Sequence, residues 1–196
     1  MPHRLDAQLE FLAEIDKLKS ILRQNLVGDR SRRENSAEHS WHLGVVACCL
    51  AEYAQEPVDL LVVVKTVLIH DLVEIDAGDT FSYDPSPKAA KVAREAEAAN
   101  RLFALLPDDQ RREWRALWQA FEDGSTAEGR FARVIDRLQP LILHDLTGGP
   151  VWKAHQVKRS QVVARVGVIE TCAPALWPWV EALLERATRD GWLVDA

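Results

Sequence analysis

Ionisable side chains gather at the end of an apolar stretch in the first half of the chain. His70 and Asp71 follow the apolar run 60–69 directly. Glu74 comes one helical turn after Asp71, and Asp79 lies just beyond a glycine. Burying an imidazole and three carboxylates costs free energy unless a cation or a polar network receives them. Imidazole and carboxylate both suit divalent metals, so the stretch predicts a metal centre, with a buried polar network as the plainer alternative.

Polar residues on otherwise apolar helical faces could complete this centre. His39 lies in the first turn of a predicted helix, and Asp136 interrupts the apolar segment of another. Two imidazoles and two carboxylates from three helices can enclose one divalent ion and leave room for water and substrate. His42, one turn after His39, stays open as a ligand or a core residue. The second His-Asp dipeptide, at 144–145, is disfavoured because no carboxylate follows it by one turn.

Helical periodicity covers nearly the whole chain, and the predicted fold class is all-α. Capping boxes place helix starts after Asn35 and Ser125, and Gly148-Gly149-Pro150 ends a helix. We expect one domain over 1–196, with its core at about 5–170. The predicted helices cover residues 5–22, 36–54, 58–70, 86–106, a segment from Pro107, 125–147, 152–171 and 174–190.

Composition narrows the partners and the compartment. The net charge is −6 without a long basic run, which disfavours a nucleic-acid polymer or an anionic membrane as partner. Three cysteines without framework spacing indicate reduced, buried thiols in the cytoplasm. We expect no signal peptide and no membrane span.

Arginines are concentrated between the first two predicted helices, at positions 23, 30, 32 and 33. Charge alone favours a solvated basic loop. The functional alternative is a loop that receives phosphate beside the metal, because arginine binds phosphate through two hydrogen bonds.

Three short segments in order carry a family resemblance. They are Glu34–Trp41, His70–Thr80 and Asp136–Pro140. Together they resemble the HD-domain metal phosphohydrolases, and among these the small bacterial group related to 5′-deoxynucleotidases. The resemblance spans about residues 5–170. It implies a helical HD-domain fold with about seven or eight helices and a homodimer.

The metal site that the resemblance implies holds one divalent ion, which could be cobalt, manganese, magnesium, zinc, iron or nickel. Its ligands would be His39, His70, Asp71 and Asp136.

By the same resemblance, the reaction is hydrolysis of a nucleoside 5′-monophosphate, a small-molecule nucleotide, with deoxyribonucleotides expected. Glu74 would orient or deprotonate the attacking water, and Asp79 would protonate the leaving oxygen. Thr80 would bind the nucleotide, and Arg23 would offset the phosphate charge. Gln24 stands where the deoxynucleotidases carry an aromatic residue that excludes the ribose 2′-hydroxyl, which leaves the sugar preference open.

Two alternatives to nucleotidase chemistry remain. Another hydrolase of the superfamily is one, but pyrophosphohydrolases carry Glu-Asp after the His-Asp pair where this chain has Val73-Glu74. Binuclear phosphodiesterases need further histidines, and His42, His144 and His155 do not form that pattern. The other is a non-catalytic metal-binding helical module, disfavoured because the expected ligands and Glu74 are all present.

Overall fold

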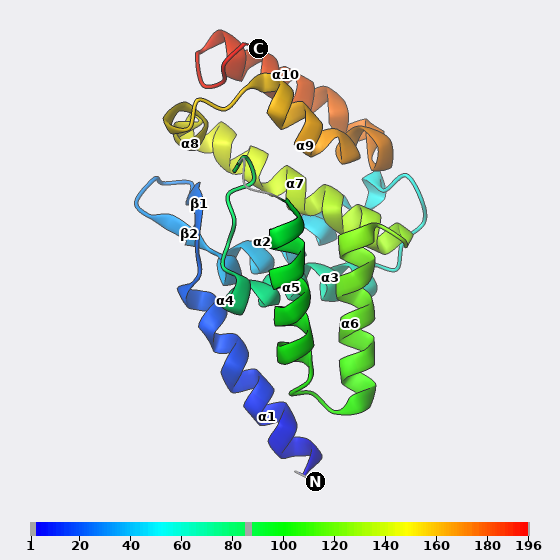
Figure 1. Cartoon of the computed structure of the whole chain (residues 1–196). Helices are drawn as coiled ribbons and strands as arrows, with labels where there is room; N and C mark the ends of the chain where they lie inside the picture. Colours follow the sequence, from blue (N-terminus) through cyan, green and yellow to red (C-terminus); the bar gives the residue numbers. More distant parts are fainter. Residues whose placement is uncertain (1–2, 85–87, 196) are drawn as a thin grey trace.

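The computed structural model describes residues 3–84 and 88–195, and this part of the chain is almost entirely helical (Figure 1). The all-α prediction is therefore confirmed. A two-stranded antiparallel hairpin is the sheet that this part contains, formed by β1 (Leu22–Leu26) and β2 (Arg33–Asn35). The α-helices are α1 (Arg4–Ile15), α2 (Ser36–Leu50), α3 (Leu60–Ile69), α4 (Glu74–Ala77), α5 (Lys88–Phe103), α6 (Asp108–Asp123), α7 (Ala127–Thr147), α8 (Pro150–Ala154), α9 (Arg159–Cys172) and α10 (Trp177–Arg189).

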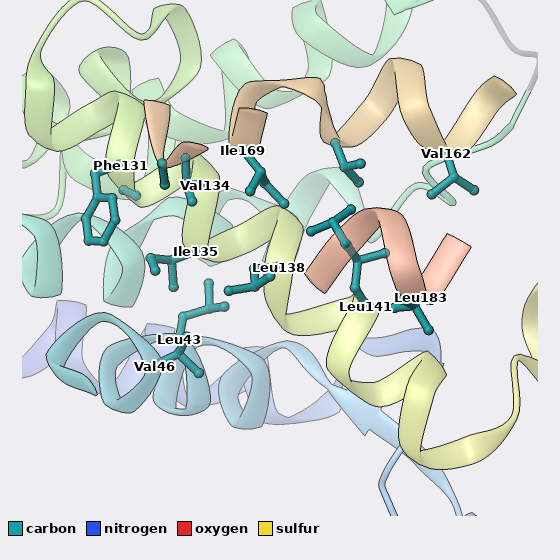
Figure 2. Packing of buried hydrophobic residues seen from close by; sticks show 14 of the residues in the cluster. Leu43, Val46, Phe131, Val134, Ile135, Leu138, Leu141, Val162, Ile169 and Leu183 are labelled. Atoms are coloured by element: carbon teal, nitrogen blue, oxygen red, sulfur yellow. The ribbon is translucent and has the colours of Figure 1, made fainter. Parts of the chain in front are cut away.

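Helix α7 forms the centre of the main core. It packs against α2, α3, α6 and α9, and Figure 1 shows α9 and α10 together at the C-terminal end of the molecule. Side chains from these helices meet in one cluster (Figure 2), which includes Leu43, Val46, Phe131, Val134, Ile135, Leu138, Leu141, Val162, Ile169 and Leu183. Full burial of one such side chain stabilises the fold by about 1.5–3 kcal/mol. This packing fixes the α7 backbone that carries Asp136.

A second apolar cluster joins α1 to α5 and α6. Phe11 is buried and meets Trp114 edge-on, with ring centroids 5.1 Å apart. Ile69 and Leu72 belong to the same cluster and flank the segment that carries His70 and Asp71. The site segment is therefore held between two cores.

Several predicted helix boundaries are confirmed. Asn35 caps α2 through the predicted capping box with Glu38, and α7 ends at Gly148 in the left-handed conformation. Pro107 caps α6. The predicted Ser125 cap is wrong, because Thr126 caps α7 and accepts a hydrogen bond from the Gly129 amide.

Three predicted helices are shorter than expected or interrupted. The helix predicted over 5–22 ends at Ile15, a 3-10 turn covers Asp16–Ser20, and the arginine-rich segment then forms the hairpin. The helix predicted over 152–171 is broken between α8 and α9 by residues 155–158. The C-terminal helix predicted over 174–190 is a 3-10 turn followed by α10. The predicted helix start at Ser86–Pro87 lies outside the described residues.

The cysteine prediction was half right. All three cysteines are free, but Cys48 and Cys49 are exposed on α2 rather than buried. Trp41 and Val45 on the same helix are exposed as well, so an apolar residue type on α2 does not by itself indicate burial. Within residues 3–84 and 88–195, no helix is both long and apolar enough to cross a membrane.

Candidate metal centre

Three buried side chains from three helices converge on one point. His39 lies in the first turn of α2, His70 follows α3 in a 3-10 turn, and Asp136 lies midway along α7. Asp136 Oδ1 lies 3.0 Å from His39 Nε2 and 3.5 Å from His70 Nε2. One potential ligand atom from each residue falls within 4.8 Å of the others. Three of the four expected ligands, His39, His70 and Asp136, therefore lie close together although they are far apart in the sequence.

Hydrogen bonds orient both imidazoles toward this point. His70 Nδ1 donates to the carbonyl oxygen of Val67 at 2.8 Å, so Nε2 carries the lone pair in the neutral ring. His39 Nδ1 lies 2.9 Å from Gln139 Oε1, which fixes the same tautomer. His70 Nε2 is buried without a hydrogen bond. A buried nitrogen that makes no hydrogen bond but faces a second imidazole and carboxylates fits a divalent cation.

Asp71 lies at the edge of the three-residue cluster. Its Oδ1 is 3.0 Å from His70 Nε2, and its Oδ2 is 3.8 Å from His39 Nε2. Arg23, from β1, donates to Asp71 Oδ2 at 3.1 Å. Asp71 can therefore serve as a fourth ligand while remaining paired to an arginine.

Electrostatics at the centre favour deprotonated ligands. Burial, reinforced by the positive charge of Arg23, lowers the pKa of His39 to about 4. Burial also disfavours charge on His70, but the carboxylates of Asp71 and Asp136 outweigh it and raise the pKa of His70 well above its ordinary value. Burial opposes charge on Asp136, yet Arg137 and the two histidines hold its pKa well below the ordinary range. A divalent ion here would displace the His70 proton.

Behind His39, a buried amide connects several polar groups. Gln139 Nε2 donates to Glu34 Oε1 at 2.8 Å and lies 3.1 Å from His42 Nδ1. Burial raises the pKa of Glu34 to about 7, against the opposing charge of Arg23. His42 thus contacts the supporting amide rather than the ligand cluster.

Two carboxyl groups lie beside the cluster on the α4 side. Ser36 donates to Glu74 Oε2 at 2.6 Å. Burial and the charge of Asp71 raise the pKa of Glu74 well above its ordinary value. Burial also raises the pKa of Asp79, whose carboxyl is hydrogen-bonded to that of Glu74. Neighbouring carboxyls that share a proton are suited to general acid–base chemistry.

A cavity of about 450 Å³ opens onto the centre. Its wall includes all the expected catalytic and substrate residues, namely Arg23, Gln24, Glu74, Asp79 and Thr80. The wall also contains Phe81, Tyr83, Lys91, Arg137 and Arg165, which sequence reasoning did not single out. Arg137 directly follows Asp136 in an apolar segment, and this was a usable signal. The sequence around Arg165 contains no such signal, because α9 reaches the cavity through its packing on α7.

Some candidates lie apart from the metal centre. Arg32 pairs with Glu38, and Arg30 is exposed with a left-handed backbone, so Arg23 is the member of the arginine group that lines the cavity. The basic-loop alternative thus fits the other arginines. In the competing dipeptide, His144 stacks on Trp152 with centroids 3.9 Å apart, while Asp145 pairs with an arginine of α10.

Curated relatives carry nucleotidase names. The human protein named 5′-deoxynucleotidase HDDC2 is 30% identical over 141 residues, which cover 71% of this chain and 68% of that protein. The yeast protein named 5′-deoxynucleotidase YGK1 is 28% identical over 140 residues, covering 69% and 64% of the two chains. The chain thus spans about two thirds of the length of these relatives.

One solved structure matches almost the entire chain. It is the predicted metal-dependent phosphohydrolase from Magnetospirillum magnetotacticum MS-1, with 52% identity and a TM-score of 0.92. The match covers 97% of this chain and 95% of the other. The family described as HD domain matches residues 15–177 of this chain, which include the three converging side chains and both carboxyls beside them. The chain belongs to the HD domain family.

Proposed function

We propose that this protein is a metal-dependent phosphohydrolase that removes phosphate from nucleoside 5′-monophosphates, with deoxyribonucleotides as the expected class. The observation that carries the proposal is the convergence of two imidazoles and a carboxylate beside a cavity whose wall includes His70 and Asp136. The names of the relatives at 28–30% identity support the substrate class.

The ligands in this proposal are His39, His70, Asp71 and Asp136, holding one divalent ion of the set cobalt, manganese, magnesium, zinc, iron and nickel. When bound, the ion would polarise a phosphoryl oxygen and lower the pKa of a water molecule. The buried His70 nitrogen without a hydrogen bond supports this assignment.

Glu74 and Asp79 are proposed to handle the protons. Glu74 is buried and held by Ser36, so its carboxyl has a fixed position from which to accept a proton from water. Asp79 lies in the cavity wall and shares a hydrogen bond with Glu74, so it can pass a proton to the leaving oxygen of the sugar. Water then adds to phosphorus as the phosphorus–oxygen bond to the nucleoside breaks.

Three cavity residues are proposed to bind the nucleotide. Arg23 is mostly buried, pairs with Asp71 and Glu34, and lines the cavity, where its guanidinium can offset the charge of a phosphate. Gln24 and Thr80 present an amide and a hydroxyl to the same space. Both are able to hydrogen-bond sugar hydroxyls.

Phosphate release from a panel of ribo- and deoxyribonucleoside monophosphates, with each metal added in turn, tests the proposal. Glu74→Gln should reduce kcat by roughly 100-fold or more while metal affinity is retained. The matched control is Glu113→Gln, an exposed glutamate on α6 paired to Lys65. If a folded, metal-loaded sample releases no phosphate from any of these nucleotides, the proposal is wrong.

The same samples separate the alternatives. Release of pyrophosphate from guanosine tetraphosphate would indicate a pyrophosphohydrolase, and opening of cyclic nucleotides would indicate a phosphodiesterase. Two tightly bound metals per chain would also favour the binuclear class. Tight metal binding without any turnover would favour the non-catalytic module.

We also propose that the protein works as a homodimer in the cytoplasm. Helix α1 exposes Leu5, Leu9 and Leu12 along one stripe, each more than half accessible to solvent, and Trp41 on α2 is 65% exposed. Apolar surface of this extent is typical of protein interfaces. The three free cysteines suit a reducing compartment.

A further inference from the structure

A second group of cationic side chains lines the cavity away from β1. Arg137 extends from α7 and Arg165 from α9, and both contribute to the cavity wall. The charged neighbours of Arg165 are Arg137, Asp136, Tyr83 and Arg133. Arg23 extends from β1 instead, and its guanidinium pairs with Asp71 at 3.1 Å and with Glu34 at 3.4 Å. Arginines from three different elements, β1, α7 and α9, therefore line the same cavity.

In the part of the chain that the structure describes, Arg165 has no direct ion-pair partner. Within residues 3–84 and 88–195, no carboxylate forms a hydrogen bond or an ion pair with its guanidinium. The side chain is half-buried, and burial together with the charge of Arg137 lowers its pKa to about 10. A partly buried cation beside a second cation is unfavourable unless an anion binds between them. This arrangement indicates a place for an anionic group of the ligand.

Arg137 becomes available when Asp136 acts as a ligand. Arg137 forms an ion pair with Asp136 Oδ2, while Asp136 Oδ1 faces His39 and His70. A carboxylate that donates charge to a divalent ion neutralises a neighbouring arginine less. Burial raises the pKa of the Tyr83 hydroxyl, and the positive charges of Arg165 and Arg137 act on it in the opposite direction. Two guanidinium groups and a phenol form a set of donors that suits phosphate.

We propose that Arg137, Arg165 and Tyr83 form a second phosphate-binding subsite, so that the preferred substrate is a nucleotide with a second phosphate besides the one removed. The inference rests on the proposed function, because the first phosphate is assigned to the metal centre and Arg23. A cavity of about 450 Å³ is of the size that holds small-molecule ligands. A nucleotide with two phosphates would place one beside Arg23 and the metal centre and the other beside Arg137 and Arg165. Each phosphate released consumes one water. In a monophosphate or a 3′,5′-bisphosphate the bond broken joins phosphorus to a sugar oxygen, whereas in a diphosphate it is the phosphoanhydride bond, and the remaining phosphate is the leaving group.

The test compares three substrates with the same base and sugar. These are deoxyadenosine 5′-monophosphate, deoxyadenosine 5′-diphosphate and deoxyadenosine 3′,5′-bisphosphate. At least one doubly phosphorylated compound should have a kcat/KM about tenfold above that of the monophosphate. Arg165→Gln should bring the ratio close to one. Arg159→Gln, on the same helix but outside the cavity wall, should leave the ratio unchanged.

Other outcomes overturn the subsite. A ratio near one in the unaltered protein would do so, as would an equal loss on all substrates in Arg165→Gln, because Arg165 would then serve the hydrolysed phosphate. If inorganic phosphate competes with the monophosphate and the second phosphate gives no advantage, the region binds free phosphate only.

A binding measurement separates this inference from the proposed function. Calorimetry of deoxyadenosine 3′,5′-bisphosphate and of the monophosphate needs no turnover. If no substrate is hydrolysed, the proposed function fails, yet tighter binding of the bisphosphate that is lost in Arg165→Gln would still support the subsite. Equal binding of the two compounds would contradict it.

Discussion

Gln139 Oε1 lies 2.9 Å from His39 Nδ1, and this contact joins α7 to the first turn of α2. Both side chains are fully buried. The amide nitrogen of Gln139 is held in turn by Glu34, so its oxygen can only face the histidine. His39 therefore has one tautomer and one ring orientation, with Nε2 directed toward Asp136.

Replacing Gln139 by leucine should weaken metal binding. Loss of the partner to a ligating histidine typically costs roughly 10- to 100-fold in metal affinity. Calorimetric titration of the metal-free protein measures this change, with circular dichroism to verify the fold. The control is Gln119→Leu, which removes an exposed amide on α6. Unchanged affinity in Gln139→Leu would show that packing alone orients His39.

Gly129→Ala should destabilise the protein. A Cβ at this position would lie 2.2 Å from the carbonyl oxygen of Ala120, which is backbone and cannot move aside easily. We expect a loss of roughly 1–3 kcal/mol in the free energy of unfolding. Gly167→Ala is the matched control, since its Cβ meets no atom within 4 Å in α9 and should stabilise by up to about 1 kcal/mol. Equal effects in urea denaturation would contradict the close approach of α6 and α7.

His144 should make the fold sensitive to acid. Burial lowers its pKa from 6.5 to about 3. Below pH 6.5, His144 is protonated in the unfolded chain but stays neutral in the folded protein, so the free energy of unfolding falls as the pH drops toward 3. The slope contributed is about 1.4 kcal/mol per pH unit at most.

Urea denaturation between pH 6 and pH 4, with a chelator present, measures this slope. His144→Phe preserves a ring on Trp152 and should flatten the dependence. His155→Phe, which replaces an exposed ring, should not. If the His144→Phe and unaltered curves stay parallel, another group controls the acid response.

Gln24→Trp should increase the preference for deoxyribose. Gln24 lines the cavity, and a large ring there would occupy space that a 2′-hydroxyl needs. We expect the deoxy-to-ribo ratio of kcat/KM to rise by about tenfold, a change typical of a lost or blocked hydroxyl contact. Paired assays on deoxyadenosine and adenosine monophosphates give the ratio. A ratio that does not change would remove Gln24 from the sugar site.

Leu9→Lys should convert a dimer into monomers. The residue is exposed near the middle of the α1 stripe, where a charge would be buried in an interface. Multi-angle light scattering over a range of concentrations reports the mass. Leu146→Lys alters another exposed leucine, on α7, and should leave the mass unchanged. Dissociation only in the Leu146 variant would place the interface elsewhere.

Much of the helical architecture could be predicted because local chemistry determines it. The Asn35–Glu38 capping box and Gly148 set helix ends through neighbouring backbone groups. The convergence of His39, His70 and Asp136 could be predicted only as a hypothesis, since it depends on how three helices cross. The roles of these residues remain predictions.

The failures share a non-local cause. Residues 16–22 keep helical apolar spacing, yet the chain turns at Ser20 because Leu18 enters one core while β1 pairs with β2. Cys48 and Cys49 lie in an apolar segment but face outward, since periodicity does not distinguish a core face from an uncovered one. Arg165 is brought to the cavity by the packing of α9 on α7.

The segment 78–84 has a consequence for protein engineering. It begins with a left-handed glycine at the end of α4 and extends along the cavity, carrying Asp79, Thr80, Phe81 and Tyr83. His39 and Asp136 lie on packed helices and His70 lies in the 3-10 turn after α3, whereas this segment lies outside regular structure. A library restricted to residues 80–84 could therefore change which molecules are accepted while leaving the helices that carry His39 and Asp136, and their cores, unaltered.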